Sequence, residues 1–235
     1  MVISTLPGTT PMQFMYRRFI RVVPLYWLAT GAALAYFYAR YDRFPTVDHW
    51  LTSLLFLPPP SPHPLPILYP GWTLNFEMAF YSIIAVSLLA GRRAFVVAAL
   101  VTMSAAALAV KTGYNAVDWY LNPRLAEFSA GLLIGIMLRR GMHIDRSYGS
   151  LLLLSGSTVL LLNSRSVPAI PILHWGLPTV AVLLGALAFE QSRIVRSRIA
   201  QVLGDASYSI YLAHPFVIWF AEWGLGPTRH PVYGW

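Results

Sequence analysis

The sequence contains no cysteine and few charged residues, which make up 11% of its 235 positions. Without cysteine, the chain has no disulfide, thiol nucleophile, Cys-based metal site or palmitoyl anchor. Soluble domains carry about 25% charged residues, so this low fraction excludes an extensive water-facing surface. Because 57% of the residues are hydrophobic, the composition indicates an integral membrane protein whose main solvent is lipid.

Lysine is almost absent as well, since Lys111 is the one lysine among 17 basic residues. The net charge of +8 comes from arginines that stand in short clusters between apolar runs. This pattern is typical of side chains that anchor helices at a membrane surface, and not of a continuous groove for nucleic acid. We therefore expect a lipid bilayer as a partner, and no nucleic acid.

Seven apolar segments predict membrane-spanning helices. Backbone polar groups inside lipid must bond internally, and these segments lack the alternation of barrel strands, so helix is the expected state. We expect an all-α fold, a polytopic transmembrane helix bundle that forms a single domain over residues 1–235. The predicted segments are residues 20–39, 72–90, 94–110, 124–138, 149–163, 171–189 and 204–222.

The distribution of basic residues predicts the orientation of these segments. If residues 1–19 lie in the cytoplasm and the segments alternate in direction, 11 basic residues fall at cytoplasmic ends and 6 at outer ends. This excess obeys the positive-inside rule, so we expect a multi-pass protein of the cell inner (plasma) membrane. The cytoplasmic residues are Arg17, Arg18, Arg21, Arg92, Arg93, Arg139, Arg140, Arg146, Arg193, Arg196 and Arg198, and the outer ones are Arg40, Arg43, Lys111, Arg124, Arg165 and Arg229.

The outer loop between the first two predicted helices is dense in proline, with the sequence PPPSPHPLPILYP at residues 58–70. Proline fixes φ and cannot continue a helix interior, so this stretch is expected to be stiff and irregular. Residues 47–57 before it are predicted to form a short re-entrant or interfacial helix.

Two arginines mark the start of the first predicted helix. Arg18 and Arg21 are spaced i, i+3, so they share one helix face. Planar guanidinium groups bind phosphate bidentately, and this pair at a cytoplasmic helix start would suit the phosphates of a large anionic cosubstrate. The alternative is that both only anchor the helix to anionic lipid headgroups.

An acidic residue interrupts the second predicted helix. Glu77 lies five residues beyond Trp72, which marks the presumed interface, and Tyr81 follows one turn further on the same face. An ionisable group at this depth is costly and usually faces a cavity or a partner. Glu77 is therefore a candidate functional residue, and a structural ion pair with an arginine is the alternative.

A polar stripe runs along the last predicted helix. Ser207, Tyr211 and His214 are spaced i, i+4, i+7 within an otherwise apolar segment. A neutral imidazole near mid-bilayer can accept or relay a proton, so His214 is a candidate base. The alternative is a structural histidine that donates to a neighbouring carbonyl group.

Other polar residues give weaker signals. Asn122, Arg124 and Glu127 are expected to form a capped and paired helix start. The remaining histidines lie at no spacing typical of metal ligands, so we expect them to be solvated and expect no metal site. They are His49, His63, His143, His174 and His230.

Four stretches, in this order, resemble motifs of the acyltransferase-3 family, multi-pass membrane O-acyltransferases that modify sugars, often of bacterial cell-envelope polysaccharides. The stretches are RRFIRVVPLYW (17–27), WTLNFEMAFY (72–81), NPRLAEFSAGLLIG (122–135) and LGDASYSIYLAHPF (203–216). Thr73 replaces the serine usual in the family. Family members usually have two more helices before the first stretch and at least one more after His214, so the resemblance implies a truncated member or a fragment.

The resemblance implies transfer of an acyl group, acetyl being the simplest, from cytosolic acyl-CoA to a hydroxyl of a cell-envelope carbohydrate, with no other cofactor. Arg18 and Arg21 are then expected to bind the acyl donor. The expected catalytic residues are Glu77, His214 and Tyr211, and the expected residues lining the substrate cavity are Trp72, Tyr81, Ser207 and Tyr208. A transporter-like or non-catalytic membrane protein, or an inactive fragment, is the alternative, and the oligomeric state stays open.

Overall fold

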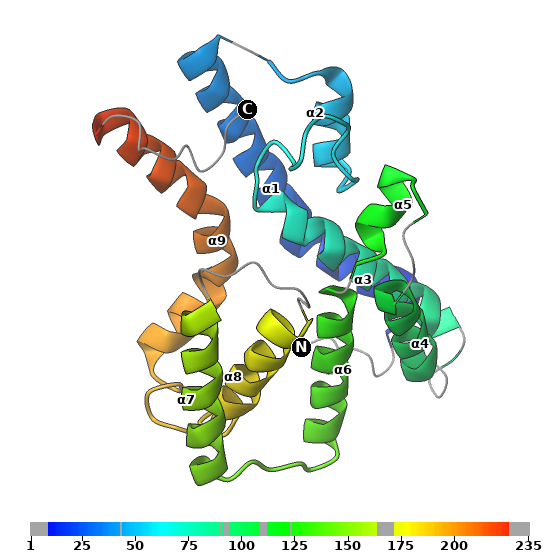
Figure 1. Cartoon of the computed structure of the whole chain (residues 1–235), viewed down its shortest axis with the longest axis vertical. Helices are drawn as coiled ribbons and strands as arrows, with labels where there is room; N and C mark the ends of the chain where they lie inside the picture. The colour runs from blue at the N-terminus through cyan, green and yellow to red at the C-terminus, as the bar shows by residue number, and fades with distance from the viewer. Residues whose placement is uncertain are drawn as a thin grey trace. The chain divides into compact units, whose positions relative to one another are not determined.

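The structure is a computed structural model that describes residues 9–42, 44–89, 91, 95–108, 112–122, 124–163 and 172–225 (Figure 1). Every regular element in these ranges is a helix. The helices are α1 (Pro11–Tyr41), α2 (Val47–Leu54), α3 (Gly71–Leu89), α4 (Phe95–Leu108), α5 (Asn115–Tyr120), α6 (Arg124–Arg139), α7 (Arg146–Asn163), a short π-helix η2 (Ile172–Gly176), α8 (Leu177–Leu187) and α9 (Arg198–Leu225).

Each of the seven predicted apolar segments falls on a helix, and the all-α prediction is confirmed for the described residues. The first and last segments were predicted too short, because α1 already begins at Pro11 and α9 at Arg198. The length of an apolar segment predicts only the part of a helix that can lie in lipid. Arginine is itself a good helix former, so the helix can extend beyond that part. The short helix expected at residues 47–57 is α2, which ends at Leu54.

Three stretches of the described residues are long and apolar enough to cross a membrane, judged by length and composition. They are Pro11–Tyr41, Gly71–Leu89 and Ala116–Arg139. The apolar helices Val96–Leu108 and Leu173–Leu187 are shorter. A multi-helix membrane protein is therefore supported, and the number of seven spans stays a prediction.

The chain divides into two compact units, and α3 contributes to both. We call residues 15–81 and 204–235 the site unit, and residues 1–14 and 82–203 the second unit. The site unit holds most of α1 and α9, all of α2, and the first half of α3. Its core contains Val23, Tyr26, Ile67 and Leu68, all with 0% of their surface exposed.

Within the site unit, α1 and α9 run parallel. The Tyr208 hydroxyl of α9 donates to the carbonyl oxygen of Val22 in α1, at 2.8 Å. Further along both helices, the Tyr36 hydroxyl of α1 donates to the carbonyl oxygen of Trp219 in α9, and the two rings stack at 5.3 Å. From the first contact to the second, the residue numbers rise along both helices, so α1 and α9 are parallel.

The first half of α3 runs antiparallel to α1. The guanidinium carbon of Arg18 lies 5.4 Å from the centre of the Tyr81 ring. Tyr26, two turns later in α1, packs against Gly71 at the start of α3. The first and seventh predicted spans therefore share one direction and the second opposes them, as the alternating topology requires.

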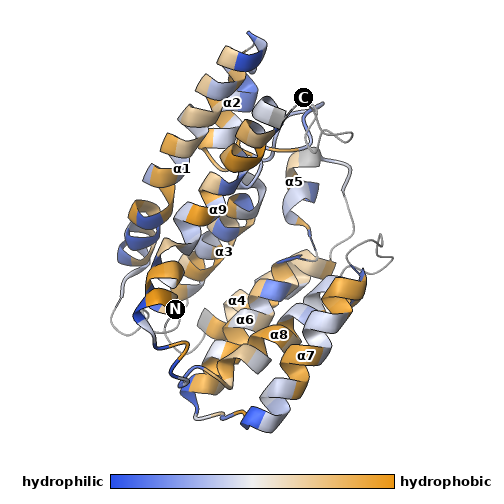
Figure 2. Ribbon diagram, turned by 90° about the vertical axis from the view of Figure 1, so that its left-hand side faces the viewer, coloured by the Kyte–Doolittle hydropathy of each residue, from blue (hydrophilic) through white to orange (hydrophobic). Residues whose placement is uncertain are grey.

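In the second unit, α7 and α8 pack closely because glycines bring their backbones together. A Cβ atom built on Gly185 would lie 2.6 Å from the Leu153 nitrogen and 2.7 Å from the Gly149 oxygen, so no larger residue fits there. Small residues serve membrane helices in this way because lipid gives no hydrophobic drive for their association. α8 is mostly hydrophobic and α7 contains hydrophobic stretches, whereas hydrophilic residues mark the turn between α6 and α7 (Figure 2).

The glycine contacts also place two arginine-rich turns at one end of the second unit. Gly149, in the first turn of α7, lies against Ala188, which directly follows α8. The α6–α7 turn with Arg140 and the turn before α9 with Arg196 therefore lie at the same end, as the charge pattern predicted. Arg92 and Arg93, predicted to lie on the same side, are outside the described residues.

Candidate functional site

A band of polar side chains follows the seam between α1, α3 and α9 in the site unit. We call it the polar band: it consists of Arg18, Tyr69, Thr73, Glu77, Tyr81, Tyr208, Tyr211 and His214. All of these residues except Arg18 and Tyr69 come from α3 and α9. Those two helices are antiparallel along the band, since contacts pair Tyr69 with His214 and Thr73 with Tyr211.

The start of α3 depends on a glycine. A Cβ atom built on Gly71 would lie 2.4 Å from the hydroxyl oxygen of Tyr26, which is fully buried and cannot move aside easily. The Tyr26 hydroxyl in turn donates to the carbonyl oxygen of Ser53 in α2, at 3.1 Å. Gly71 thus lets the first turn of α3 approach α1 closely, which fixes the position of Tyr69 just before it.

The geometry of His214 follows from the proline after it. Pro215 lies inside α9 and has no N–H group, so the carbonyl oxygen of Tyr211, four residues earlier, loses its helix donor. His214 Nδ1 lies 2.5 Å from that same oxygen. Because a carbonyl oxygen only accepts hydrogen bonds, Nδ1 carries the proton.

The other ring nitrogen of His214 is also engaged. The Tyr69 hydroxyl forms a short hydrogen bond with His214 Nε2. With the proton of the neutral ring on Nδ1, Nε2 accepts, and Tyr69 donates. His214 was predicted as the base, and the Tyr211 carbonyl and Tyr69 hold its ring in the state in which Nε2 can take a proton.

Glu77 lies near the middle of the band, between α1 and α9. The Tyr81 hydroxyl donates a short hydrogen bond to its carboxylate, as their one-turn spacing allows. Arg18, only 4% exposed, lies over the Tyr81 ring, and the charge of Glu77 also acts on Tyr208 across the seam. Tyr81 thus links the two charged residues, because its hydroxyl binds Glu77 and its ring lies against the guanidinium group of Arg18.

Two of the predicted residues of α9 tie the helices together. The Tyr211 hydroxyl lies 2.7 Å from Thr73 Oγ1 and 3.2 Å from the Pro70 carbonyl oxygen, so it joins α9 to the beginning of α3. The Tyr208 hydroxyl joins α9 to α1. Thr73 keeps the hydroxyl of the serine that it replaces, and that hydroxyl makes the contact with Tyr211.

Three other predicted residues lie at the margin of the band or outside it. Arg21 is exposed but close enough to Tyr81 to interact with it electrostatically. Trp72 is partly exposed, with its ring edge-to-face on Phe76. Ser207 is exposed and donates to the Gly204 carbonyl oxygen of its own helix, because the inward face of α9 is the one that carries Tyr208 and Tyr211.

The prediction that His49 is solvated is wrong. His49 in α2 has no exposed surface, its Nε2 lies 3.0 Å from the Leu65 carbonyl oxygen, and its ring stacks on His63 at 4.0 Å. Burial holds the pKa of His49 below its ordinary value, and the neighbouring His63 lowers it further, against the opposing effects of the Leu65 carbonyl and Asp48. The proline-rich loop turns carbonyl groups inward, so α2 turns its polar side toward them.

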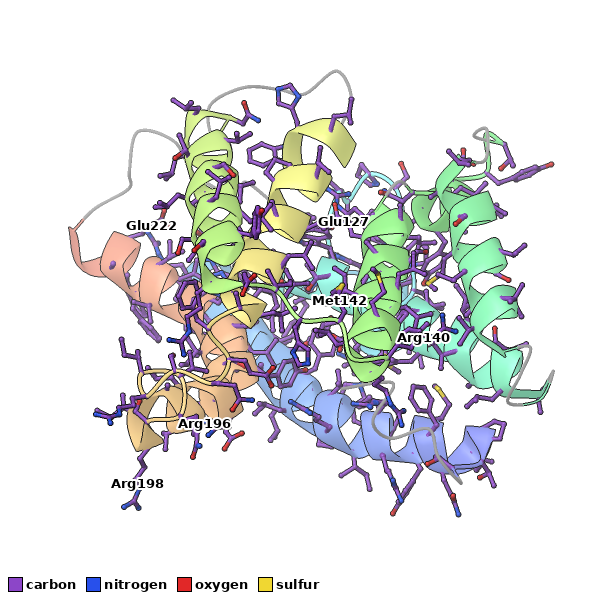
Figure 3. All side chains as sticks on the ribbon, turned by 90° about the horizontal axis from the view of Figure 1, so that it is seen from below. Glu127, Arg140, Met142, Arg196, Arg198 and Glu222 are labelled. Carbon is purple, nitrogen blue, oxygen red and sulfur yellow. The ribbon has the colours of Figure 1, made fainter. Side chains whose placement is uncertain are left out.

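The start of α6 is capped as the sequence predicted. The Arg124 N–H group donates to Asn122 Oδ1 at 3.1 Å, and Glu127 lies in the first turn (Figure 3). Among the other histidines, His143 is exposed and His174 partly exposed, while His230 lies outside the described residues.

Sequence reasoning missed Tyr69 as a site residue. Tyr69 lies in a loop 145 residues away from His214, so no helical spacing could pair them. The signal that was available is the dipeptide before Gly71, where a tyrosine and a proline end the loop at the start of a motif helix. Thr73 was noticed only as a departure from the family motif.

Comparison with known proteins shows the family of this chain. A family model described as an acyltransferase domain, that of the acyltransferase-3 family, matches residues 1–234. The chain is 39% identical over 233 residues to the exopolysaccharide production protein ExoZ of Rhizobium meliloti (strain 1021), a match that covers 92% of this chain and 71% of the relative. No solved structure matches the chain. The chain therefore belongs to the acyltransferase-3 family, and it is an acyltransferase.

Proposed function

We propose that this chain is an inner-membrane O-acyltransferase that moves an acyl group, acetyl in the simplest case, from cytosolic acyl-CoA to a hydroxyl of an exopolysaccharide. The observation that supports this most strongly is the polar band, in which a histidine and a glutamate lie on facing helices of an acyltransferase. The name of the relative, an exopolysaccharide production protein, supports the class of acceptor.

The two ends of the polar band suit two different substrates. Arg18, Arg21 and Tyr81 lie at the end expected to face the cytoplasm, where guanidinium groups would bind the phosphates of acyl-CoA. His214 lies level with the beginning of α3. Gly71, the first residue of α3, lies ten residues before Tyr81, which corresponds to about 15 Å of helix rise. This separation is comparable with the length of an extended pantetheine arm, which would carry the thioester from the arginines to the histidine.

Acyl transfer requires a general base and charged or polar groups that stabilise the charge developing in the transition state. The acceptor hydroxyl loses its proton toward His214, and its oxygen bonds to the thioester carbonyl carbon. When the resulting tetrahedral intermediate collapses, the carbon–sulfur bond breaks and CoA leaves as the thiolate, which takes up the proton. Glu77 is expected to set the electrostatics of the seam through Tyr81 and Tyr208.

An acyl-transfer assay tests this proposal. The protein in lipid nanodiscs is given acetyl-CoA labelled in the acetyl group together with a bacterial exopolysaccharide, and label bound as an alkali-labile ester is measured. Glu77→Gln should abolish labelling, because it keeps the shape and removes the charge. Glu222→Gln is the matched control, a partly exposed glutamate of α9 outside the band that should retain full labelling (Figure 3).

Two results would contradict the proposal. One is the absence of ester-linked label with the unaltered protein when CoA thioesters of several acyl groups have been tried. The other is equal loss in both glutamate variants, which would show that the charge of Glu77 has no special part in the transfer.

A further inference from the structure

We propose that Tyr69, and not His214, is the group that contacts the acceptor hydroxyl, and that His214 accepts the proton from Tyr69. The inference rests on the proposed function, because it names the residue that the acceptor meets in the same site. It starts from the two hydrogen bonds that engage both ring nitrogens of His214.

The first step concerns what His214 can reach. Its Nδ1 is committed to the Tyr211 carbonyl oxygen, which Pro215 leaves without its helix donor. Its Nε2 is covered by the Tyr69 hydroxyl. A substrate hydroxyl therefore finds no open nitrogen on the ring, and a proton enters His214 through Tyr69.

The second step concerns what Tyr69 can do. A phenolic hydroxyl both donates and accepts, so while it donates to Nε2 its oxygen can still accept a hydrogen bond from an acceptor alcohol. Tyr69 is partly exposed, whereas the Ile67 and Leu68 side chains before it are fully buried. The loop thus presents Tyr69 from an anchored base.

The third step concerns how firmly Tyr69 is held. The Ile67 N–H group donates to Ser53 Oγ at 3.0 Å, which ties the loop to α2. The Trp72 N–H group donates to the Tyr69 carbonyl oxygen at 3.2 Å, which ties Tyr69 to the first turn of α3. A catalytic hydroxyl needs this degree of fixation, since small displacements of reacting groups cost large factors in rate.

The proposed step is balanced as follows. The acceptor alcohol gives its proton to the Tyr69 oxygen as Tyr69 gives its own proton to His214 Nε2, so the ring becomes an imidazolium. The alcohol oxygen bonds to the thioester carbonyl carbon, and the carbon–sulfur bond breaks. The proton returns from His214 through Tyr69 to the departing thiolate, which restores both residues.

The test compares two tyrosine variants in the nanodisc assay with acetyl-CoA and exopolysaccharide. Tyr69→Phe should lower kcat by about 100-fold or more, the range typical of a lost proton-transfer group, while the KM for acetyl-CoA changes less than twofold. The matched control is Tyr36→Phe, since Tyr36 is also partly buried and its hydroxyl also donates to α9, but to the backbone carbonyl oxygen of Trp219. That variant should keep the full rate.

A second measurement separates proton transfer from a merely structural role. Fluorotyrosine placed at position 69 keeps the shape of the side chain but has a more acidic phenol, so the pH–rate profile should move to lower pH. A structural tyrosine would leave the profile unchanged. This variant also covers the case in which Tyr69→Phe fails to fold.

The outcomes distinguish this inference from the proposed function. If the unaltered protein transfers acyl groups and Tyr69→Phe retains more than half of its kcat while His214→Ala has none, the inference is overturned and the proposed function stands. An unmoved pH profile with fluorotyrosine overturns it as well. If the unaltered protein transfers no acyl group, the proposed function itself has failed.

Discussion

The two arginines at the start of α1 share a helix face but have different surroundings. Arg18 is buried, with its guanidinium group against the Tyr81 ring, and the hydroxyl of that ring donates to Glu77. Arg21 is exposed at the same end of the band. The spacing predicted a pair with one role, whereas the structure buries the side chain of Arg18 and leaves that of Arg21 exposed.

This difference gives a prediction at the residue scale. Arg21→Gln should raise the KM for acyl-CoA about tenfold or more, because charge-assisted contacts to phosphate contribute roughly 1.5–3 kcal/mol. The acceptor KM should stay the same. Steady-state kinetics with each substrate varied in turn measures both values.

Arg40→Gln is the control, since Arg40 is also exposed but lies in the last turn of α1, at the opposite end from Arg21. If both variants raise the donor KM equally, the arginines act only through their general attraction for anionic lipid and donor. That outcome would favour the headgroup-anchor interpretation.

At the same scale, local contacts could be predicted and distant ones could not. Tyr81 and Glu77 are one helical turn apart, so their hydrogen bond follows from helix geometry. The pairing of Tyr69 with His214 depends on how α9 packs against the end of a proline-rich loop, which no periodicity reports. The inward turn of His49 was missed for the same reason.

At the scale of elements, α2 has its polar side inward and its apolar side outward. His49 and Ser53 are buried, whereas Val47, Leu51 and Leu55 are exposed. The Leu65 carbonyl oxygen and the Ile67 N–H group of the loop supply hydrogen-bond partners on the inside, and lipid is expected to cover the outside. The short helix predicted within residues 47–57 is confirmed in place, and its re-entrant or interfacial character stays a prediction.

The buried His49 makes the stability of this element depend on pH. Its pKa is lowered in the folded protein, so below the ordinary value near 6.5 the unfolded state binds a proton that the folded state does not. Stability conferred by the neutral ring is therefore present above about pH 6.5 and is lost as the pH falls toward the lowered pKa. The temperature of the thermal unfolding midpoint, measured in detergent, should therefore be lower at pH 5 than at pH 7.5.

His49→Gln should flatten this pH dependence, because glutamine can donate to the Leu65 carbonyl but does not titrate in this range. His143→Gln serves as the comparison, since His143 is exposed and should leave the slope as it is. A slope that is the same in all three proteins would show that His49 is not its source.

At the scale of the whole molecule, helix directions can be compared within each unit with the predicted topology. In the site unit α3 opposes α1, while α9 follows α1. In the second unit α7 and α8 are antiparallel, so that the turns with Arg140 and Arg196 lie at one end. The predicted topology took this alternation as its premise, and charge chose between its two orientations, because basic side chains mark the cytoplasmic ends of membrane helices.

Cysteine labelling in intact cells tests the orientation, and the chain has no cysteine to give a background signal. Cysteine in place of His143 or Ile194, both exposed in arginine-rich turns, should resist a membrane-impermeant thiol reagent. Cysteine in place of Ser61, exposed in the proline-rich loop, should react. The reverse pattern would invert the topology, whereas reaction at all three positions would contradict the membrane-spanning arrangement.

The proline-rich loop has one more consequence, which concerns conformational entropy. Seven of its 13 residues are proline, whose ring already fixes φ in the unfolded chain. Ordering an average residue costs about 1–2 kcal/mol of backbone entropy, and proline has less freedom to lose. The loop that carries Tyr69 is therefore preorganised by its covalent structure, so an acceptor that meets Tyr69 as proposed spends little binding energy on ordering it.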